Sequence, residues 1–319
     1  MPSCFSFTAR RDACYQTSFK KSGLRSTTTD LGDGTVVHCW APRAHSSSKP
    51  TLVLLHGFGA NAMWQFAAFL PSLRPHFNLY VPDLLFFGDS HTTRPDRSES
   101  FQAIAVAAAL DSLIPSATLH IFGISYGGFV AYRMAAQAAP GRVGRVVLGC
   151  AGVCLEEGDM EAGMFRVKSV EEAVEILLPR EPAKVRELLK LAFYKPPPSG
   201  PSCFLNDFIE VMCTEYRQEK KELIYALHKD RKMSDLPRIT QPTLIVWGEY
   251  DQIFPIELGH RLKRHIGENA ELVIIKNAGH AINAEKAKEL LKHMKSFLLA
   301  DIAPPSKGVV THNNGNTKD

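Results

Sequence analysis

Residues 118–130 read TLHIFGISYGGFV and join two segments of different character. The run 118–122 is apolar enough for a buried strand, and residues 129–139 have the character of a helix. Between them, residues 123–127 (GISYG) match G-x-S-x-G, the nucleophile elbow, in which a sharp strand-to-helix turn holds a serine in a strained backbone conformation. The residues on either side of the serine must be small, because other segments of backbone pass close to them. Gly123 and Gly127 meet this requirement. The surrounding strand and helix make the pattern specific, so we predict that Ser125 is a nucleophile.

A serine nucleophile needs a base, and that base needs an acid to orient it. In enzymes with this elbow the acid and then the histidine follow the serine, each on a loop after a later strand. Asp251 lies just beyond the strand-like run 243–246, and His280 lies on the loop after the run 271–275. We therefore predict a catalytic triad of Ser125, Asp251 and His280. Glu249 is the rival for the acid, and the other histidines are interpreted as surface or core residues.

Ester chemistry also needs two donors for the oxyanion of the tetrahedral intermediate. One is expected to be the backbone N–H of Tyr126, the residue after the nucleophile. The other should come from the loop after the strand-like run 51–55, which continues as HGFG. Glycines let that loop turn its N–H groups inward, so Phe58 is predicted as the second donor. His56 is interpreted as a structural hydrogen-bonding residue.

Strand-like runs alternate with helical segments along most of the chain. They occur at residues 35–40, 51–55, 77–81, 118–122, 145–148, 243–246 and 271–275. Most are continuously apolar, which is typical of parallel strands covered on both faces. The Gly-Asp-Gly sequence at 32–34 predicts a hairpin turn before the first run. The alternation indicates an α/β protein with a parallel sheet.

The interval 154–236 breaks this alternation because it contains no strand-like run. Apolar residues recur there at helical spacing, as in Val170, Val174, Leu177, Val185, Leu188, Leu189, Ala192, Leu205, Phe208, Ile209 and Met212. This pattern predicts an all-helical insertion between two strands of the sheet. Such insertions usually cover the carboxyl ends of the strands, so we expect a cap over a pocket.

The motifs HGFG, GISYGG, WGEYD and NAGH resemble those of the α/β-hydrolase superfamily, in the branch with an H-G-x-G oxyanion loop and a helical cap. The resemblance runs from about residue 35 to residue 299. It implies a mostly parallel eight-stranded sheet with helices on both faces and a helical cap between strands 6 and 7. The core would comprise residues 35–153 and 237–301, with the cap at 154–236. Within the superfamily the chain is most similar to plant esterases, lipases or carbon–carbon-bond hydrolases.

One departure from the family pattern concerns the loop at residues 83–90. Relatives often carry D-x-x-G-x-G-x-S there, whereas this chain reads DLLFFGDS. Phe86 takes the place of a glycine, which predicts a loop of different shape. We expect Phe86 and Phe87 to line the substrate pocket with aromatic surface.

Composition narrows the class of protein. The formal charge of +4 on 319 residues is small and scattered, so nucleic acid is not an expected partner. Seven cysteines without a C-x-x-C pair argue against a disulfide framework or a metal site and fit reduced thiols inside a cell. No apolar run approaches the ~18 residues of a membrane span. We expect no cofactor, and the sequence identifies no protein partner.

The two ends of the chain differ in composition from the rest. Residues 1–25 are basic and contain several Ser and Thr, which partly fits a transit peptide to a plastid or mitochondrion. Resemblance to relatives through about residue 40 favours instead an N-terminal segment, 1–34, that packs on the core of a cytoplasmic protein. The polar tail at 302–319 is predicted to be disordered.

The leading hypothesis is a serine hydrolase that cleaves a carboxylic ester of a small or lipid-like apolar substrate through an acyl-enzyme. The serine at position 125 excludes relatives with an aspartate nucleophile, such as haloalkane dehalogenases and soluble epoxide hydrolases. One alternative is a carbon–carbon-bond hydrolase of the meta-cleavage type, with Arg166, Arg180 or Arg217 binding a carboxylated substrate. The other is a small-molecule receptor that retains the triad and acts through a partner.

Overall fold

The computed structural model describes residues 6–59 and 61–300. In that part of the chain the sheet has the order β1-β2-β4-β3-β6-β7-β8-β9, and the two-residue β5 pairs with β2. Pairing is antiparallel from β1 to β4 through β2 and parallel from β4 to β9. The predicted mostly parallel, eight-stranded sheet is confirmed, with β5 as a short addition. The strands are β1 (Leu24–Asp30), β2 (Thr35–Pro42), β3 (Thr51–Leu55), β4 (Asn78–Pro82), β5 (His91–Thr92), β6 (Leu119–Ile124), β7 (Val143–Gly149), β8 (Thr243–Gly248) and β9 (Ala270–Ile275).

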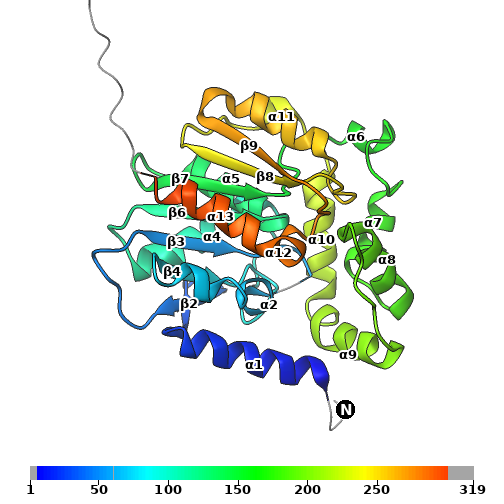
Figure 1. Cartoon of the computed structure of the whole chain (residues 1–319), viewed down its shortest axis with the longest axis horizontal. Coiled ribbons are helices and arrows are strands. Elements are labelled where there is room, and N and C mark those ends of the chain that lie inside the picture. Colours follow the sequence, from blue (N-terminus) through cyan, green and yellow to red (C-terminus); the bar gives the residue numbers. More distant parts are fainter. Residues whose placement is uncertain (1–5, 60, 301–319) are drawn as a thin grey trace, which may run out of the picture.

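Helices cover both faces of this sheet. In Figure 1, α13 (Ala287–Leu298) lies in front of the strands, while α4 (Glu99–Leu113) and α5 (Tyr126–Gln137) lie behind them. The other core elements are α1 (Phe7–Lys21), α2 (Ala62–Phe66), α3 (Leu70–Leu73), α11 (Ile256–Ile266), α12 (Ile282–Glu285) and the 3₁₀ turns η1 (Met233–Asp235) and η2 (Gly267–Asn269). Cover on both sides explains why β3, β4 and β8 are buried at every position.

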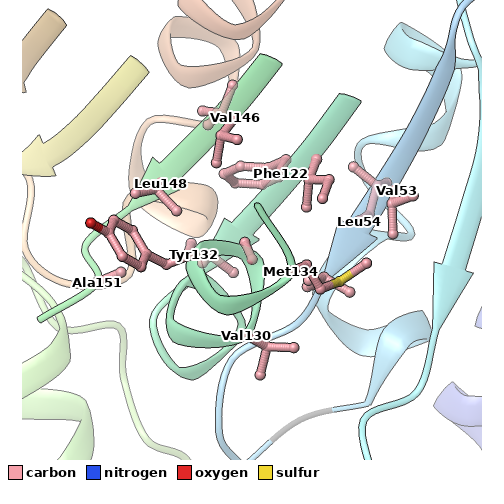
Figure 2. Packing of buried hydrophobic residues seen from close by; sticks show 14 of the residues in the cluster. Val53, Leu54, Phe122, Val130, Tyr132, Met134, Val146, Leu148 and Ala151 are labelled. Carbon is pink, nitrogen blue, oxygen red and sulfur yellow. The ribbon is translucent and has the colours of Figure 1, made fainter. Parts of the chain in front are cut away.

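Large aromatic side chains pack around β6, the strand that leads into the elbow. The Phe122 ring on β6 lies 6.0 Å from the Phe66 ring and 6.4 Å from the Phe69 ring, centroid to centroid. Figure 2 shows Phe122 of β6 beside Val146 of β7, with the Tyr132 ring of α5 near Leu148 of β7. Burying each large apolar side chain contributes roughly 1.5–3 kcal/mol. This packing fixes the strand and the helix that meet at the elbow.

Five helices lie between β7 and β8, in the interval where the sequence predicts a helical insertion. They are α6 (Gly158–Glu161), α7 (Val170–Leu177), α8 (Pro182–Ala192), α9 (Ser202–Cys213) and α10 (Arg217–His228). In Figure 1 they stand together to one side of the sheet. Four residues of α8 and α9 form a small apolar cluster separate from the main core, namely Val185, Leu205, Ile209 and Cys213. We refer to α6–α10 as the cap.

A buried ion-pair network joins the segment that follows the last cap helix, α10, to the core. The Glu99 carboxylate at the start of α4 accepts hydrogen bonds from Arg231, which follows α10, at 2.8 Å and from Arg133 of α5 at 3.2 Å. Glu99 is only 5% exposed. Burial alone would raise its pKa, but the two guanidinium groups outweigh that effect and hold the pKa below its ordinary value of 4.5. Glu99 is therefore ionised and stabilising at neutral pH.

Replacing this carboxylate should give a pH-dependent loss of stability. Because the folded-state pKa of Glu99 is depressed, its contribution is complete above pH 4.5 and is lost as the pH falls below that value. We expect Glu99→Gln to lower the free energy of unfolding by about 3 kcal/mol at pH 7, since it leaves Arg231 buried without its counter-charge. Urea unfolding at pH 7 and at pH 4 measures this, and the difference between wild type and variant should narrow at pH 4. A difference that does not depend on pH would contradict the assigned role.

The N-terminal helix α1 packs against the rest of the fold. Phe19 on α1 is fully buried and belongs to the main hydrophobic cluster. Ser6 caps the helix by accepting a hydrogen bond from the N–H of Ala9. Across residues 6–59 and 61–300, no helix combines the length and apolar character needed to cross a bilayer. The tail predicted to be disordered, 302–319, lies outside the described residues.

Candidate active site

The elbow has the strained geometry that its sequence requires. Ser125 has φ 53° and ψ −123°, and α5 begins at the next residue. The left-handed φ costs a residue with a side chain of order 1–3 kcal/mol and persists only where the surroundings enforce it. Here a Cβ added to Gly123 would lie 2.2 Å from the carbonyl oxygen of Gly127, and one added to Gly127 would lie 2.3 Å from that of Leu55. Only glycine fits at these two positions, so the turn holds Ser125 at the end of β6.

Ser125, His280 and Asp251 form a continuous chain of hydrogen bonds. Ser125 Oγ lies 2.9 Å from His280 Nε2, and His280 Nδ1 lies 2.8 Å from Asp251 Oδ2. The carboxylate can only accept, so Nδ1 donates to it and Nε2 is left to accept from the serine hydroxyl. The other carboxylate oxygen, Oδ1, accepts from the backbone N–H groups of Ile253 and Phe254, both at 2.9 Å. The structure thus brings the three predicted residues together.

The rival acid has a different partner. The Glu249 carboxylate accepts a hydrogen bond from the backbone N–H of Asn277 at 3.0 Å. It stabilises the loop that follows β9, whereas the Asp251 side chain is fully buried against the imidazole. The structure places Asp251, and not Glu249, in contact with His280.

Glu285 on α12 is a support that the sequence did not reveal. Its carboxylate accepts from the N–H of Gly279 at 2.7 Å and from the N–H groups of Tyr194 and Lys195 at 3.1 and 3.0 Å. The residue before His280 is thereby joined to the segment that follows cap helix α8. A carboxylate five positions after a histidine carries no local signal for a contact this distant in sequence.

The two predicted oxyanion donors lie on the wall of one cavity with Ser125. Phe58 and Tyr126 both line it, and no described residue accepts a hydrogen bond from either backbone N–H. The preceding amide, of Gly57, donates instead to the side-chain oxygen of Gln65 at 3.3 Å. Two unpaired amides next to the nucleophile are the arrangement that stabilises a developing oxyanion.

His56 has the structural role that was predicted for it. Its Nδ1 donates to the carbonyl oxygen of Gly57 at 2.8 Å, and its Nε2 accepts from the N–H of Leu84 at 3.0 Å. Both ring nitrogens are therefore committed to backbone groups. Burial lowers the pKa of His56 and keeps the ring neutral, which matches one donating and one accepting nitrogen. The ring fixes the oxyanion loop against the loop after β4.

The cavity in front of the triad has a volume of about 440 Å³ and is mostly apolar. Cap residues supply much of its wall, for example Phe165, Ile176, Leu188, Leu189, Phe208 and Met212. Within the described part of the chain, neither arginine nor lysine is among the lining residues. The site is suited to an apolar group that projects from the reacting carbonyl.

Phe86 and Phe87 do not line this cavity, so that expectation was wrong. Phe86 adopts φ 74°, in the left-handed region that favours glycine, so the loop keeps a glycine-like backbone despite the substitution. Its buried ring lies 5.7 Å from the Tyr216 ring and beneath the Arg97 guanidinium at 4.8 Å. The Phe87 ring packs 5.2 Å from the rings of both His56 and Phe58. Phe87 therefore supports the oxyanion loop from behind, because Phe58 is the residue that faces the cavity.

One group of side chains in the described part of the chain has metal-ligand spacing. Potential ligand atoms of Cys150, Asp251 and His280 lie within 4.8 Å of one another. Asp251 and His280 are already hydrogen-bonded to each other, and burial raises the pKa of the Cys150 thiol well above its ordinary value. A metal ion would have to break the hydrogen bond between Asp251 and His280 and displace the proton of a buried thiol, so the group does not fit a metal site.

Comparison with known proteins agrees with this geometry. A family model described as the alpha/beta hydrolase family matches residues 52–292. Monoacylglycerol lipase ABHD6 of Bos taurus is 28% identical over 82% of this chain and 78% of its own length. Lipase 1 of Psychrobacter immobilis is 25% identical over 86% of this chain and 83% of its own length. Among solved structures, the lip1 candidate lipase of Acinetobacter baumannii AYE is similar with a TM-score of 0.77 and 25% identity, over 90% of this chain and 95% of that one.

These relatives come from cattle and from bacteria. They give no support to the expected similarity to plant proteins. The family match covers the elbow, the oxyanion loop and the segments that carry Asp251 and His280. The chain therefore belongs to the alpha/beta hydrolase family, as a lipase- and esterase-like member.

Proposed function

We propose that this protein is a serine hydrolase that cleaves a carboxylic ester of an apolar, lipid-like substrate through an acyl-enzyme. The observation that carries the proposal is the hydrogen-bond chain from Ser125 through His280 to Asp251, which opens on an apolar cavity. The backbone N–H groups of Phe58 and Tyr126, which have no acceptor among the described residues, can stabilise the negative charge of the oxyanion.

The geometry supports a definite sequence of steps. Ser125 Oγ attacks the ester carbonyl as His280 Nε2 takes its proton, and Asp251 stabilises the imidazolium that forms. The N–H groups of Phe58 and Tyr126 hold the oxyanion. His280 then donates the proton to the leaving alcohol, which departs and leaves an acyl-Ser125 ester. Water activated by His280 attacks that ester, the acid is released, and Ser125 recovers its proton.

The cavity wall supports an apolar acyl group as the part of the substrate that is bound. Its cap side is built mainly from leucine, isoleucine, valine and phenylalanine side chains, which stabilise hydrocarbon, and His228 of α10 is a polar exception. The names of the relatives, monoacylglycerol lipase and lipase, point to the same class of ester. We therefore propose esters of medium or long acyl chains.

The residues that line the cavity can also be compared with the requirements of the two alternative functions. A meta-cleavage substrate carries a carboxylate, but the cap arginines considered for it are absent from the cavity lining. Arg217, for example, donates to the backbone carbonyl oxygens of Leu178 and Cys213. A receptor would bind its ligand in the same cavity, and turnover of an ester at enzymatic rates distinguishes it from the hydrolase.

Rates on p-nitrophenyl esters of increasing acyl length test the proposal. Each buried CH₂ is worth about 0.8 kcal/mol, so kcat/KM should rise by up to about fourfold per carbon from the acetate until the cavity is filled. Hydrolysis by a Ser125→Ala variant gives the background to subtract. Rates that do not change with acyl length would contradict an apolar acyl site. Turnover of a vinylogous diketone in the absence of ester turnover would move the assignment to carbon–carbon cleavage.

A further inference from the structure

Two aromatic residues on one wall of the cavity come from opposite sides of the boundary between core and cap. Trp64 belongs to α2 of the core, and Phe208 belongs to α9 of the cap. Both line the cavity, and their rings meet edge to face with centroids 6.0 Å apart. This pair closes the wall only while α2 and α9 keep their relative position. Something must therefore hold these two short elements together.

Helix α1 holds the core member of the pair. Asp12 Oδ1 accepts a hydrogen bond from the indole N–H of Trp64 at 3.0 Å. The Tyr15 ring packs edge to face on the indole at 5.3 Å, and the Arg11 guanidinium lies 5.7 Å from its centre. Since no residue of α1 lines the cavity, α1 acts on Trp64 from the side away from the substrate.

The same helix holds the cap member of the pair through α9. Asp207, next to Phe208, accepts a hydrogen bond from the backbone N–H of Thr8 at 2.7 Å. That N–H lies in the first turn of α1, where amide donors have no partner within the helix and favour a negative charge. The Phe7 and Phe204 rings add an edge-to-face contact at 4.4 Å. In Figure 1 the start of α1 lies beside α9, so the helix bridges core and cap.

We propose that α1 is part of the substrate-binding apparatus, in which Asp12 is a positioning residue that fixes Trp64 against Phe208 and so determines how well long acyl chains bind. The inference rests on the proposed ester hydrolysis, because it concerns the acyl cavity of that reaction. A short acyl group stays next to Ser125 and does not need the aromatic wall. A long acyl chain needs it, because its distal carbons gain their binding energy from a rigid apolar surface.

The variant Asp12→Ala separates these two cases. Loss of the indole hydrogen bond should raise KM for a dodecanoyl ester about fivefold with kcat retained, while both constants for the butanoyl ester stay within twofold. Asp12→Asn keeps a side-chain oxygen that can accept from the indole and should behave as the wild type. Gln16→Ala, on an exposed part of α1, is the matched control and should change neither KM nor kcat for either ester.

A second variant removes the same hydrogen bond from its other partner, so the test does not depend on whether Asp12→Ala folds. Trp64→Phe keeps an aromatic ring but removes the N–H donor, so it should also raise KM for the dodecanoyl ester. The double variant should then show no further effect of Asp12→Ala, because the two changes remove one interaction. Equal losses on both esters, or additive effects of the two changes, would overturn the proposal. Failure of the wild type to react with a fluorophosphonate at Ser125 would instead count against the proposed function.

Discussion

Ser125→Ala is expected to lower kcat for ester hydrolysis by about 10⁶-fold, the largest effect of any single change in this chain. The substitution removes the only atom that can form the acyl-enzyme, Oγ, which lies 2.9 Å from His280 Nε2. The amides of Phe58 and Tyr126 remain, so a small residual rate from the oxyanion site over the uncatalysed reaction is expected. Initial rates on the best acyl ester measure the loss.

Two controls distinguish loss of the nucleophile from loss of the fold. The β6–α5 turn keeps its glycines in Ser125→Ala, so the midpoint of thermal unfolding should match the wild type. Ser112→Ala, on the exposed side of α4, is a matched serine deletion whose hydroxyl only bonds back to the carbonyl of Ala108. It should leave kcat unchanged. A Ser125→Ala protein that kept more than a hundredth of the wild-type kcat would contradict the assignment of the nucleophile.

Asp251→Asn is expected to lower kcat by about 10⁴-fold. Oδ1 of Asp251 accepts two backbone N–H groups, from Ile253 and Phe254. Asparagine would keep its carbonyl oxygen at that position and turn its NH₂ group toward His280 Nδ1. Because an NH₂ group donates, Nδ1 would have to accept, and the ring proton would move to Nε2. Nε2 could then no longer take the proton of Ser125.

Glu249→Gln is the matched control for Asp251→Asn. It makes the same carboxylate-to-amide change two residues away, at the side chain that accepts from Asn277 and not from His280. The control should retain kcat within about twofold, while kcat for Asp251→Asn is measured on the same ester. Comparable losses for the two variants would show that the loop after β8, and not the tautomer of His280, is responsible.

The triad could be predicted from sequence because each of its residues follows a strand that can be recognised from its apolar residues. Runs such as 118–122 and 243–246 are mostly apolar, and the carboxyl ends of parallel strands meet at one edge of a sheet. Ser125, Asp251 and His280 therefore converge by topology. Strand β1 is different, because its residues after Leu24 are polar or charged and none of them is fully buried. Only the turn at 32–34 indicated that a strand precedes β2.

Side-chain direction in loops could not be predicted in the same way. Phe86 and Phe87 lie on the loop after β4, close to the site in sequence order, yet their rings contact Tyr216 and Phe58 instead of the cavity. Phe86 has a left-handed φ, and its ring packs under Arg97, a contact that the sequence pattern does not indicate. Contacts between segments that are distant in the sequence could not be predicted either. Glu285 accepts a hydrogen bond from Tyr194, and Asp12 accepts one from Trp64, and neither pair of residues shares a sequence pattern that predicts the contact.

Reaction with an alkyl fluorophosphonate is the most direct test of whether Ser125 is an activated nucleophile that faces an apolar cavity. The reagent would be added to the folded protein, activity followed with time, and the modified peptide located by mass spectrometry. We expect one adduct, on Ser125, that accumulates in step with the loss of ester hydrolysis and is absent from Ser125→Ala. A folded protein that stays unmodified, or an adduct on another residue with Ser125 untouched, would contradict it.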